Sequence, residues 1–135
     1  MTPPDTTPRP SPLRWLPAAL WACVIFAGSS LNGSLIPSQL SVYGHVSEYL
    51  VLGALVMFAE RHRGLGRAAI IAVLVCAAYG ASDEFHQAFV PLRTPDPIDW
   101  ITDVAGASAG IALYAVTSRV RGLLRTKRGP GTPPQ

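Results

Sequence analysis

Residues 68–82 read AAIIAVLVCAAYGAS, a run of 15 residues without a charged side chain. A helix at the surface of a soluble protein needs a polar outer face, and this run offers none. The run at 15–28, WLPAALWACVIFAG, lacks one as well. Hydrophobic residues make up 49% of the chain and charged residues only 14%, against about 25% charged residues in soluble proteins. Both runs therefore predict transmembrane helices rather than helices of a soluble bundle.

Four apolar segments divide the chain, at residues 15–31, 46–59, 68–82 and 101–118. A membrane-spanning helix needs about 20 mainly apolar residues, so we expect the polar residues that flank these short segments at, or just inside, the membrane boundary. We predict an all-α membrane protein with four transmembrane helices. The membrane domain is expected at 14–120, between a disordered Pro-rich tail at 1–13 and a disordered basic tail at 121–135.

The basic residues indicate an orientation. Ten of the eleven Lys and Arg residues lie before the first segment, between the second and third, or after the fourth, and only Arg93 lies on the other side. Because loops rich in Lys and Arg stay in the cytoplasm, we predict a multi-pass plasma-membrane protein with both termini in the cytoplasm. A cleaved signal peptide is the alternative for the first segment, but no clear A-x-A site is present and further hydrophobic spans follow.

Polar side chains collect at the predicted outer ends of the later segments. In each segment they share a helical face with small or aromatic residues, as Asp99 and Asp103 do with Gly106, Gly110 and Leu113. Polar groups at membrane depth turn away from lipid, so we expect these faces to meet inside the bundle, and the GxxxG spacing favours a close helix approach. The candidate functional residues are His45, Glu48, Tyr49, Asp83, Glu84, His86, Gln87, Arg93, Asp99 and Asp103.

Arg93 lies in the loop FVPLRTPDPIDW, residues 89–100, which three prolines stiffen. Two interpretations of this arginine stay open. In the first, Arg93 neutralises buried acids, with Asp83 or a neighbouring acid as its partner, which is the commoner role for such a residue. In the second, Arg93 binds an anionic group such as a lipid phosphate or a peptide carboxylate.

Three sequence blocks resemble the VanZ-like family: HVSEYLVLG at 45–53, SDEFHQ at 82–87, and PLRTP at 91–95 followed by Asp99. The family pattern combines His…Tyr-x-x-Leu-Gly, Asp-Glu-x-His-Gln and Pro-Gly-Arg…Asp-x-x-x-Asn-x-x-Gly. Two departures bear on the site. Leu92 stands where the family usually has Gly, and Asp103 stands where it usually has Asn, which adds an acid to the site.

The resemblance implies a small multi-pass protein of the bacterial cell envelope. The founding member of the family is associated with low-level resistance to the glycopeptide teicoplanin, so a role in antibiotic resistance is one expectation. The expected partners are membrane lipids and a lipid-linked cell-wall precursor or a glycopeptide. A homo-oligomer is compatible with the sequence, and no nucleic-acid partner is expected.

Three functions are compatible with the polar residues. The first is a protein that binds a lipid-linked or lipoglycopeptide ligand at the outer leaflet. The second is a membrane-embedded enzyme, for which His45, Glu48, Asp83 and His86 are the candidate metal ligands. The third is a polar network that only holds the helices together. The balance is against an enzyme, because no Ser-centred elbow or Cys–His pair lies at this depth, and no cofactor is predicted.

Overall fold

The computed structural model describes residues 11–31 and 38–127. Over this part of the chain all regular structure is helical, which confirms the all-α prediction. The elements are the 3-10 helix η1 (Pro12–Trp15), α1 (Leu16–Ser29), α2 (Ser38–Glu60), the 3-10 helix η3 (Arg61–Arg63), α3 (Leu65–Gln87) and α4 (Pro97–Lys127).

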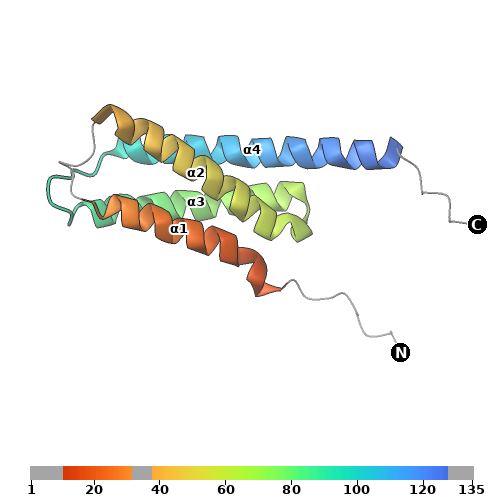
Figure 1. Ribbon diagram of the computed structural model, residues 1–135, viewed down its shortest axis with the longest axis horizontal. Helices are drawn as coiled ribbons and strands as arrows, with labels where there is room; N and C mark the ends of the chain where they lie inside the picture. Colours follow the sequence, from red (N-terminus) through yellow and green to blue (C-terminus); the bar gives the residue numbers. More distant parts are fainter. Residues whose placement is uncertain (1–10, 32–37, 128–135) are drawn as a thin grey trace, which may run out of the picture.

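The four long helices lie side by side as a bundle (Figure 1). Helix α2 packs against each of the other three, most extensively against α4. The start of α1, the turn between α2 and α3, and the end of α4 lie at one end of the bundle, which we call the basic end. The opposite end, called the polar end, holds the end of α1, the start of α2, the end of α3 and the start of α4.

Local sequence sets where the helices begin and end at both ends of the bundle. At the basic end, Gly64 has a φ of 83°, a left-handed conformation that favours glycine, and it separates η3 from α3. At the polar end, Oδ1 of Asp96 accepts a hydrogen bond of 2.8 Å from the Ile98 amide, and Pro97 is the first residue of α4. These two caps hold the chain reversals on either side of α3.

Three helices are longer than the apolar segments of the sequence, since α2 already begins at Ser38 rather than near residue 46. Helix α3 continues past the apolar run to Gln87, so the acidic and His-Gln residues at 83–87 belong to its last turns. Helix α4 continues past residue 120 to Lys127, where a disordered tail was expected. Leu, Arg and Lys have high helix propensity, and they make up most of this last stretch, which explains the extension. Of the expected tails at 1–13 and 121–135, residues 1–10 and 128–135 lie outside the described residues, and Pro12 and Leu13 belong to the 3-10 helix η1 rather than to a disordered tail.

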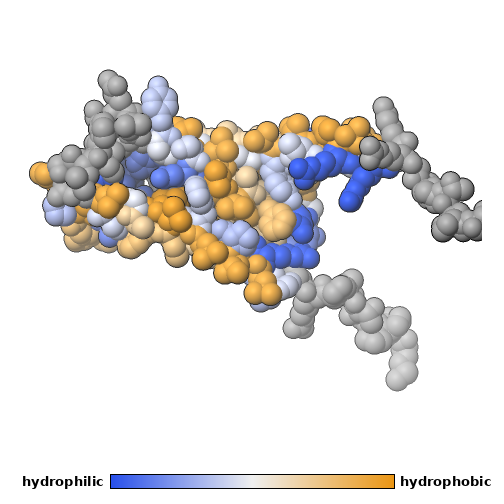
Figure 2. All heavy atoms as spheres, viewed as in Figure 1, coloured by the Kyte–Doolittle hydropathy of each residue, from blue (hydrophilic) through white to orange (hydrophobic). Residues whose placement is uncertain are grey.

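Three stretches of the bundle are long and apolar enough to cross a membrane: Pro12–Ser29, Leu65–Gln87 and Pro97–Thr126. Their outer surfaces carry large exposed apolar side chains, among them Leu20, Val24, Ile70, Leu74 and Val116. Figure 2 shows apolar side chains along the length of the bundle and hydrophilic side chains gathered at the basic end. Among the described residues α2 is not one of these three stretches, so the fourth span remains a prediction.

Glycines allow α2 and α4 to touch through their backbones. A Cβ atom at Gly106 would lie 2.6 Å from the carbonyl oxygen of Val46. A Cβ atom at Gly110 would overlap the carbonyl of Leu50, and the same holds for Gly53 against Ala107. The GxxxG spacing therefore brings α4 close to α2, as predicted. Beyond Gly110 the predicted inward face is wrong at Leu113, which is 56% exposed.

Candidate functional site

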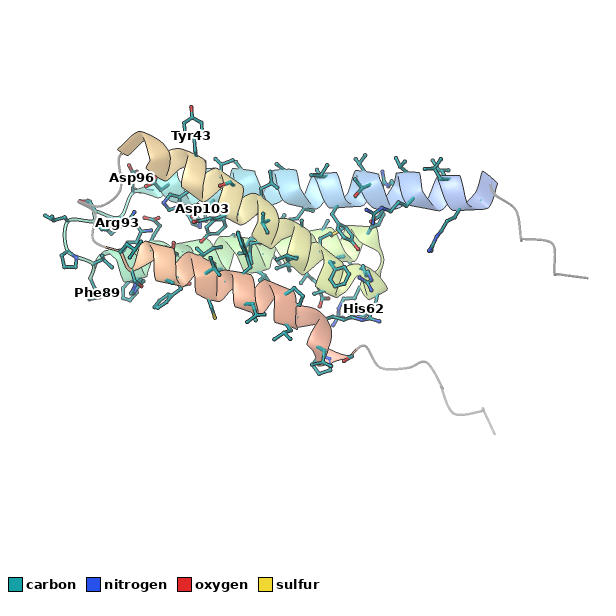
Figure 3. All side chains as sticks on the ribbon, in the orientation of Figure 1. Tyr43, His62, Phe89, Arg93, Asp96 and Asp103 are labelled. Carbon is teal, nitrogen blue, oxygen red and sulfur yellow. The ribbon has the colours of Figure 1, made fainter. Side chains whose placement is uncertain are left out.

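The polar end joins three buried side chains from three different helices. His45 of α2, Glu84 of α3 and Asp103 of α4 each present a donor atom within 4.8 Å of the other two. Nδ1 of His45 lies 3.0 Å from Oδ1 of Asp103, and the Asp103 side chain is fully buried. Figure 3 shows Asp103 between the helices at the same end as Arg93 and Asp96, far from His62 at the basic end.

Glu84 is oriented by the start of α4. The backbone N–H of Asp96 donates a hydrogen bond of 2.9 Å to Oε2 of Glu84. The same Asp96 caps α4 with its side chain, so one residue fixes both the helix start and the carboxylate. The second oxygen, Oε1, is buried and has no hydrogen-bond partner in the described part of the chain.

Asp83 and His86 face α1 rather than the triad of His45, Glu84 and Asp103. Ser29 donates a hydrogen bond of 2.8 Å to Oδ2 of Asp83, and the Gln87 amide donates a longer one of 3.3 Å to the same atom. Nε2 of His86 lies 3.0 Å from the Ser30 hydroxyl, and its ring lies 4.4 Å from the ring of Phe26. These contacts join the end of α3 to the end of α1.

Tyr49 lies at the centre of the bundle, one turn below His45. Its side chain is fully buried and its ring centroid lies 6.1 Å from that of Tyr79. Close approach of α3 is possible because Gly80 has no side chain: a Cβ there would lie 3.3 Å from Oδ2 of Asp103 and 3.5 Å from the Tyr49 ring. The hydroxyl of Tyr49 has no hydrogen-bond partner among the described residues.

The remaining candidates lie at the margin of the triad. Glu48 is half-buried, and its backbone carbonyl accepts a hydrogen bond of 2.9 Å from the indole of Trp21. Asp99 is half-buried in the first turn of α4. These two acids are therefore more accessible than Glu84 and Asp103 and are not members of the triad.

Arg93 is held by a tight turn whose geometry the sequence left open. The Arg93 amide donates a hydrogen bond of 3.2 Å to the Val90 carbonyl, and Pro91 and Leu92 occupy the two central positions. Leu92 has a φ of 61°, the left-handed conformation that glycine adopts most easily. Proline followed by a residue with positive φ is typical of a type II turn. The turn thus keeps a glycine-type conformation although leucine occupies the position.

The first interpretation of Arg93, a direct ion pair with Asp83 or a neighbouring acid, has no counterpart among the described residues. Within residues 11–31 and 38–127, Arg93 has no carboxylate oxygen within 4.0 Å, and its buried Nε has no hydrogen-bond partner. Asp83 instead accepts hydrogen bonds from Ser29 and Gln87. The prediction that Arg93 forms a direct ion pair with Asp83 or a neighbouring acid is therefore wrong for the described residues; uncharged donors on α1 and α3 bond Oδ2 of Asp83, and its Oδ1 has no partner among them.

Five buried polar atoms, four at the polar end and one on Tyr49 below it, have no hydrogen-bond partner in the described part of the molecule. They are the Tyr49 hydroxyl, Asp83 Oδ1, Glu84 Oε1, Arg93 Nε and Asp103 Oδ2. Buried polar atoms are normally hydrogen-bonded, and each exception calls for an explanation such as a bound ion, water or ligand. Three of these atoms are carboxylate oxygens, which accept hydrogen bonds, and Nε of Arg93 is a cationic donor.

Sequence reasoning missed the contribution of α1 and of Trp100. Ser29 and Ser30 end the first span, where two neutral hydroxyls are easily taken for the end of a helix. Only the packing of α1 against α3 shows that they meet Asp83 and His86. Trp100, in the first turn of α4, donates a hydrogen bond of 2.9 Å from its indole N–H to the Ala77 carbonyl of α3.

Comparison with protein families matches residues 14–118 to the VanZ/LLP1 family model. The chain belongs to the VanZ/LLP1 family. The match begins just before α1 and ends within α4. It confirms the resemblance drawn from the three sequence blocks. Comparisons with curated proteins and with solved structures find no match.

The family and the apolar helices together indicate a membrane protein of the VanZ type. In this VanZ/LLP1 protein the site offers two kinds of chemistry. The triad of one imidazole and two carboxylates suits a cation. Arg93, on the stiff turn above it, suits an anion because a guanidinium presents several N–H donors in one plane.

Proposed function

We propose that this VanZ/LLP1 protein spans the bacterial plasma membrane four times, with its basic end in the cytoplasm. Helix α2 has 23 residues, which corresponds to about 34 Å of helix and suffices to cross the hydrocarbon core. Its polar residues need not face lipid, since the other three helices pack around it. Arg14, Arg61 and Arg119 line a pocket of about 500 Å³ at the basic end, as expected for a surface beside anionic lipids.

In this orientation the polar end opens toward the outer leaflet, and we propose that it binds an anionic, lipid-linked ligand of the cell envelope. The observation that carries this proposal is the buried Nε of Arg93, a cationic donor without a partner among the described residues. Leaving such a donor unsatisfied costs free energy, and a phosphate oxygen of a bound ligand would satisfy it. A lipoglycopeptide carboxylate offers the same chemistry.

A role in teicoplanin resistance follows as part of the same proposal. A protein that engages a lipid-linked precursor at the outer leaflet competes with a glycopeptide for the same molecule, or engages the glycopeptide itself. Either route changes susceptibility without any bond being made or broken. A membrane-embedded enzyme would instead change the chemical structure of the precursor.

Cells that express the wild type, Arg93→Gln or no protein separate these functions. We expect the wild type to change teicoplanin susceptibility while the composition of envelope lipids and peptidoglycan precursors stays the same, and Arg93→Gln to behave like the empty strain. Arg67→Gln is a matched control, because Arg67 is exposed at the basic end. A changed precursor that depends on the protein would contradict ligand binding and favour catalysis.

A further inference from the structure

We infer that His45, Glu84 and Asp103 form a binding site for one divalent transition-metal ion. The three residues belong to α2, α3 and α4, and all three are buried. Of the four metal ligands considered from the sequence, the triad contains only His45. Glu84 and Asp103 take the place of the other three candidates. The inference is independent of the lipid-linked ligand, because it concerns the binding of the ion alone.

The spacing of the donor atoms fits an ion between them. A metal bonded to imidazole nitrogen and carboxylate oxygen at about 2.1 Å keeps neighbouring ligand atoms about 3.0–3.4 Å apart. Nδ1 of His45 and Oδ1 of Asp103 are 3.0 Å apart. Glu84 supplies a third donor atom within 4.8 Å of both.

Charge and hydrogen bonding point to a cation as well. Asp103 is 0% exposed and Glu84 is 8% exposed. Among the described residues neither carboxylate has an Arg or Lys within 4.0 Å, and one oxygen of each, Oδ2 and Oε1, is unpartnered. Burying two carboxylates is costly when only one histidine, which carries at most a single positive charge, lies beside them. A divalent ion beside a neutral histidine compensates both.

The surroundings hold the ligands in place before any ion binds. The Asp96 amide fixes Oε2 of Glu84 and leaves Oε1 free. The absence of a side chain at Gly80 leaves room for Oδ2 of Asp103 next to α3. Such outer contacts orient metal ligands in proteins. Three protein ligands also leave coordination positions open for water or an oxygen of another molecule.

The mixture of ligand atoms narrows the choice of ion. Imidazole favours zinc, iron and nickel, whereas carboxylates also accept manganese. One nitrogen with two carboxylates is unsuited to a copper(I) or iron–sulfur centre, which need thiolates. Zn²⁺, which imidazole favours, and Mn²⁺, which carboxylates accept, are therefore the two metal ions chosen as probes.

The test uses the full-length protein in detergent micelles, stripped with EDTA and then freed of chelator. Calorimetric titration with Zn²⁺ and with Mn²⁺, and elemental analysis of the loaded protein, give the affinity and the stoichiometry. We expect one ion per chain. Glu84→Gln and Asp103→Asn should each weaken binding at least about tenfold, the smallest loss usual when a metal site is disturbed.

The controls are Glu48→Gln and Asp99→Asn, which remove half-buried acids one turn from the triad and should weaken binding far less than tenfold. Asn is the residue that the VanZ-like pattern has at position 103, so Asp103→Asn is expected to fold. As a second measurement, the wild type should show a rise in unfolding temperature that saturates at one equivalent of metal, and Asp103→Asn should show none. A wild type that binds no ion, or controls that lose binding equally, would overturn the inference.

Discussion

His45 and Asp103 lie 58 positions apart in the sequence and join α2 to α4 through a contact of 3.0 Å between Nδ1 and Oδ1, with Asp103 fully buried. Truncating His45 to Ala would leave the Asp103 carboxylate buried without this partner. We expect a loss of about 3 kcal/mol in the free energy of unfolding, the usual cost of breaking a buried pair.

The measurement is chemical unfolding in detergent for His45→Ala, Asp103→Ala and the double variant. The sum of the two single-variant losses in unfolding free energy should exceed the loss of the double variant by more than about 1 kcal/mol, because residues in direct contact are coupled. Additive losses would mean that the contact does not stabilise the bundle.

The contact between Gly110 and the Leu50 carbonyl gives a prediction about packing. Gly110→Ala places a methyl group where the α2 backbone lies, so the helices must separate, and we expect a destabilisation of about 1–3 kcal/mol. Gly122→Ala is the matched control on the same helix, because a Cβ at Gly122 meets open space. Alanine there should be neutral or stabilise by up to about 1 kcal/mol through helix propensity. Equal effects of the two variants in thermal unfolding would refute the close approach.

Leu92 gives a prediction about strain. A left-handed conformation costs a non-glycine residue about 1–2 kcal/mol, and Leu92 is 77% exposed, so its side chain contributes little packing. Leu92→Gly should therefore raise the unfolding free energy by about 0.5–1 kcal/mol after the entropy of glycine is subtracted. Leu92→Ala keeps the strain and should change little. A Gly variant no more stable than the Ala variant would argue that the turn is unstrained.

The proposed orientation predicts opposite labelling of the two ends. In a variant lacking Cys23 and Cys76, single cysteines replace His62 at the basic end or Thr94 at the polar end, both of which are exposed. A membrane-impermeant thiol reagent added to intact cells should label position 94 and not position 62, with detergent-opened cells as the control for reactivity. Labelling of position 62 alone would contradict the prediction and place the basic end outside the cell.

Much of the fold could be predicted from the sequence because local rules act strongly in this chain. Apolar runs without a polar face predicted the helices, and the shared inward faces of those helices predicted the burial of Tyr49, Asp103 and Gly106. The lengths were less predictable, since α3 and α4 continue into polar residues that are themselves good helix formers.

The partners within the site could not be predicted in the same way. Helical periodicity states which residues share a face, but it does not state which atoms of two helices meet. Asp83 meets the neutral Ser29 of α1 rather than Arg93, and Glu84 rather than Asp83 joins His45 and Asp103. Both outcomes depend on the relative rotation and depth of the helices, which are tertiary properties.

Direct binding to the full-length protein in lipid nanodiscs tests the central claim, that the polar end binds an anionic lipid-linked ligand through Arg93. The probes are a polyprenyl phosphate and the matching uncharged polyprenol, measured on the wild type, Arg93→Gln, Arg93→Lys and the basic-end control Arg67→Gln. We predict that the wild type and Arg67→Gln prefer the phosphate. Arg93→Gln should lose at least about tenfold in affinity, as expected for a charge-assisted hydrogen bond, and Arg93→Lys should not restore it. Equal affinity for the two probes, or full phosphate binding by Arg93→Gln, would contradict the claim.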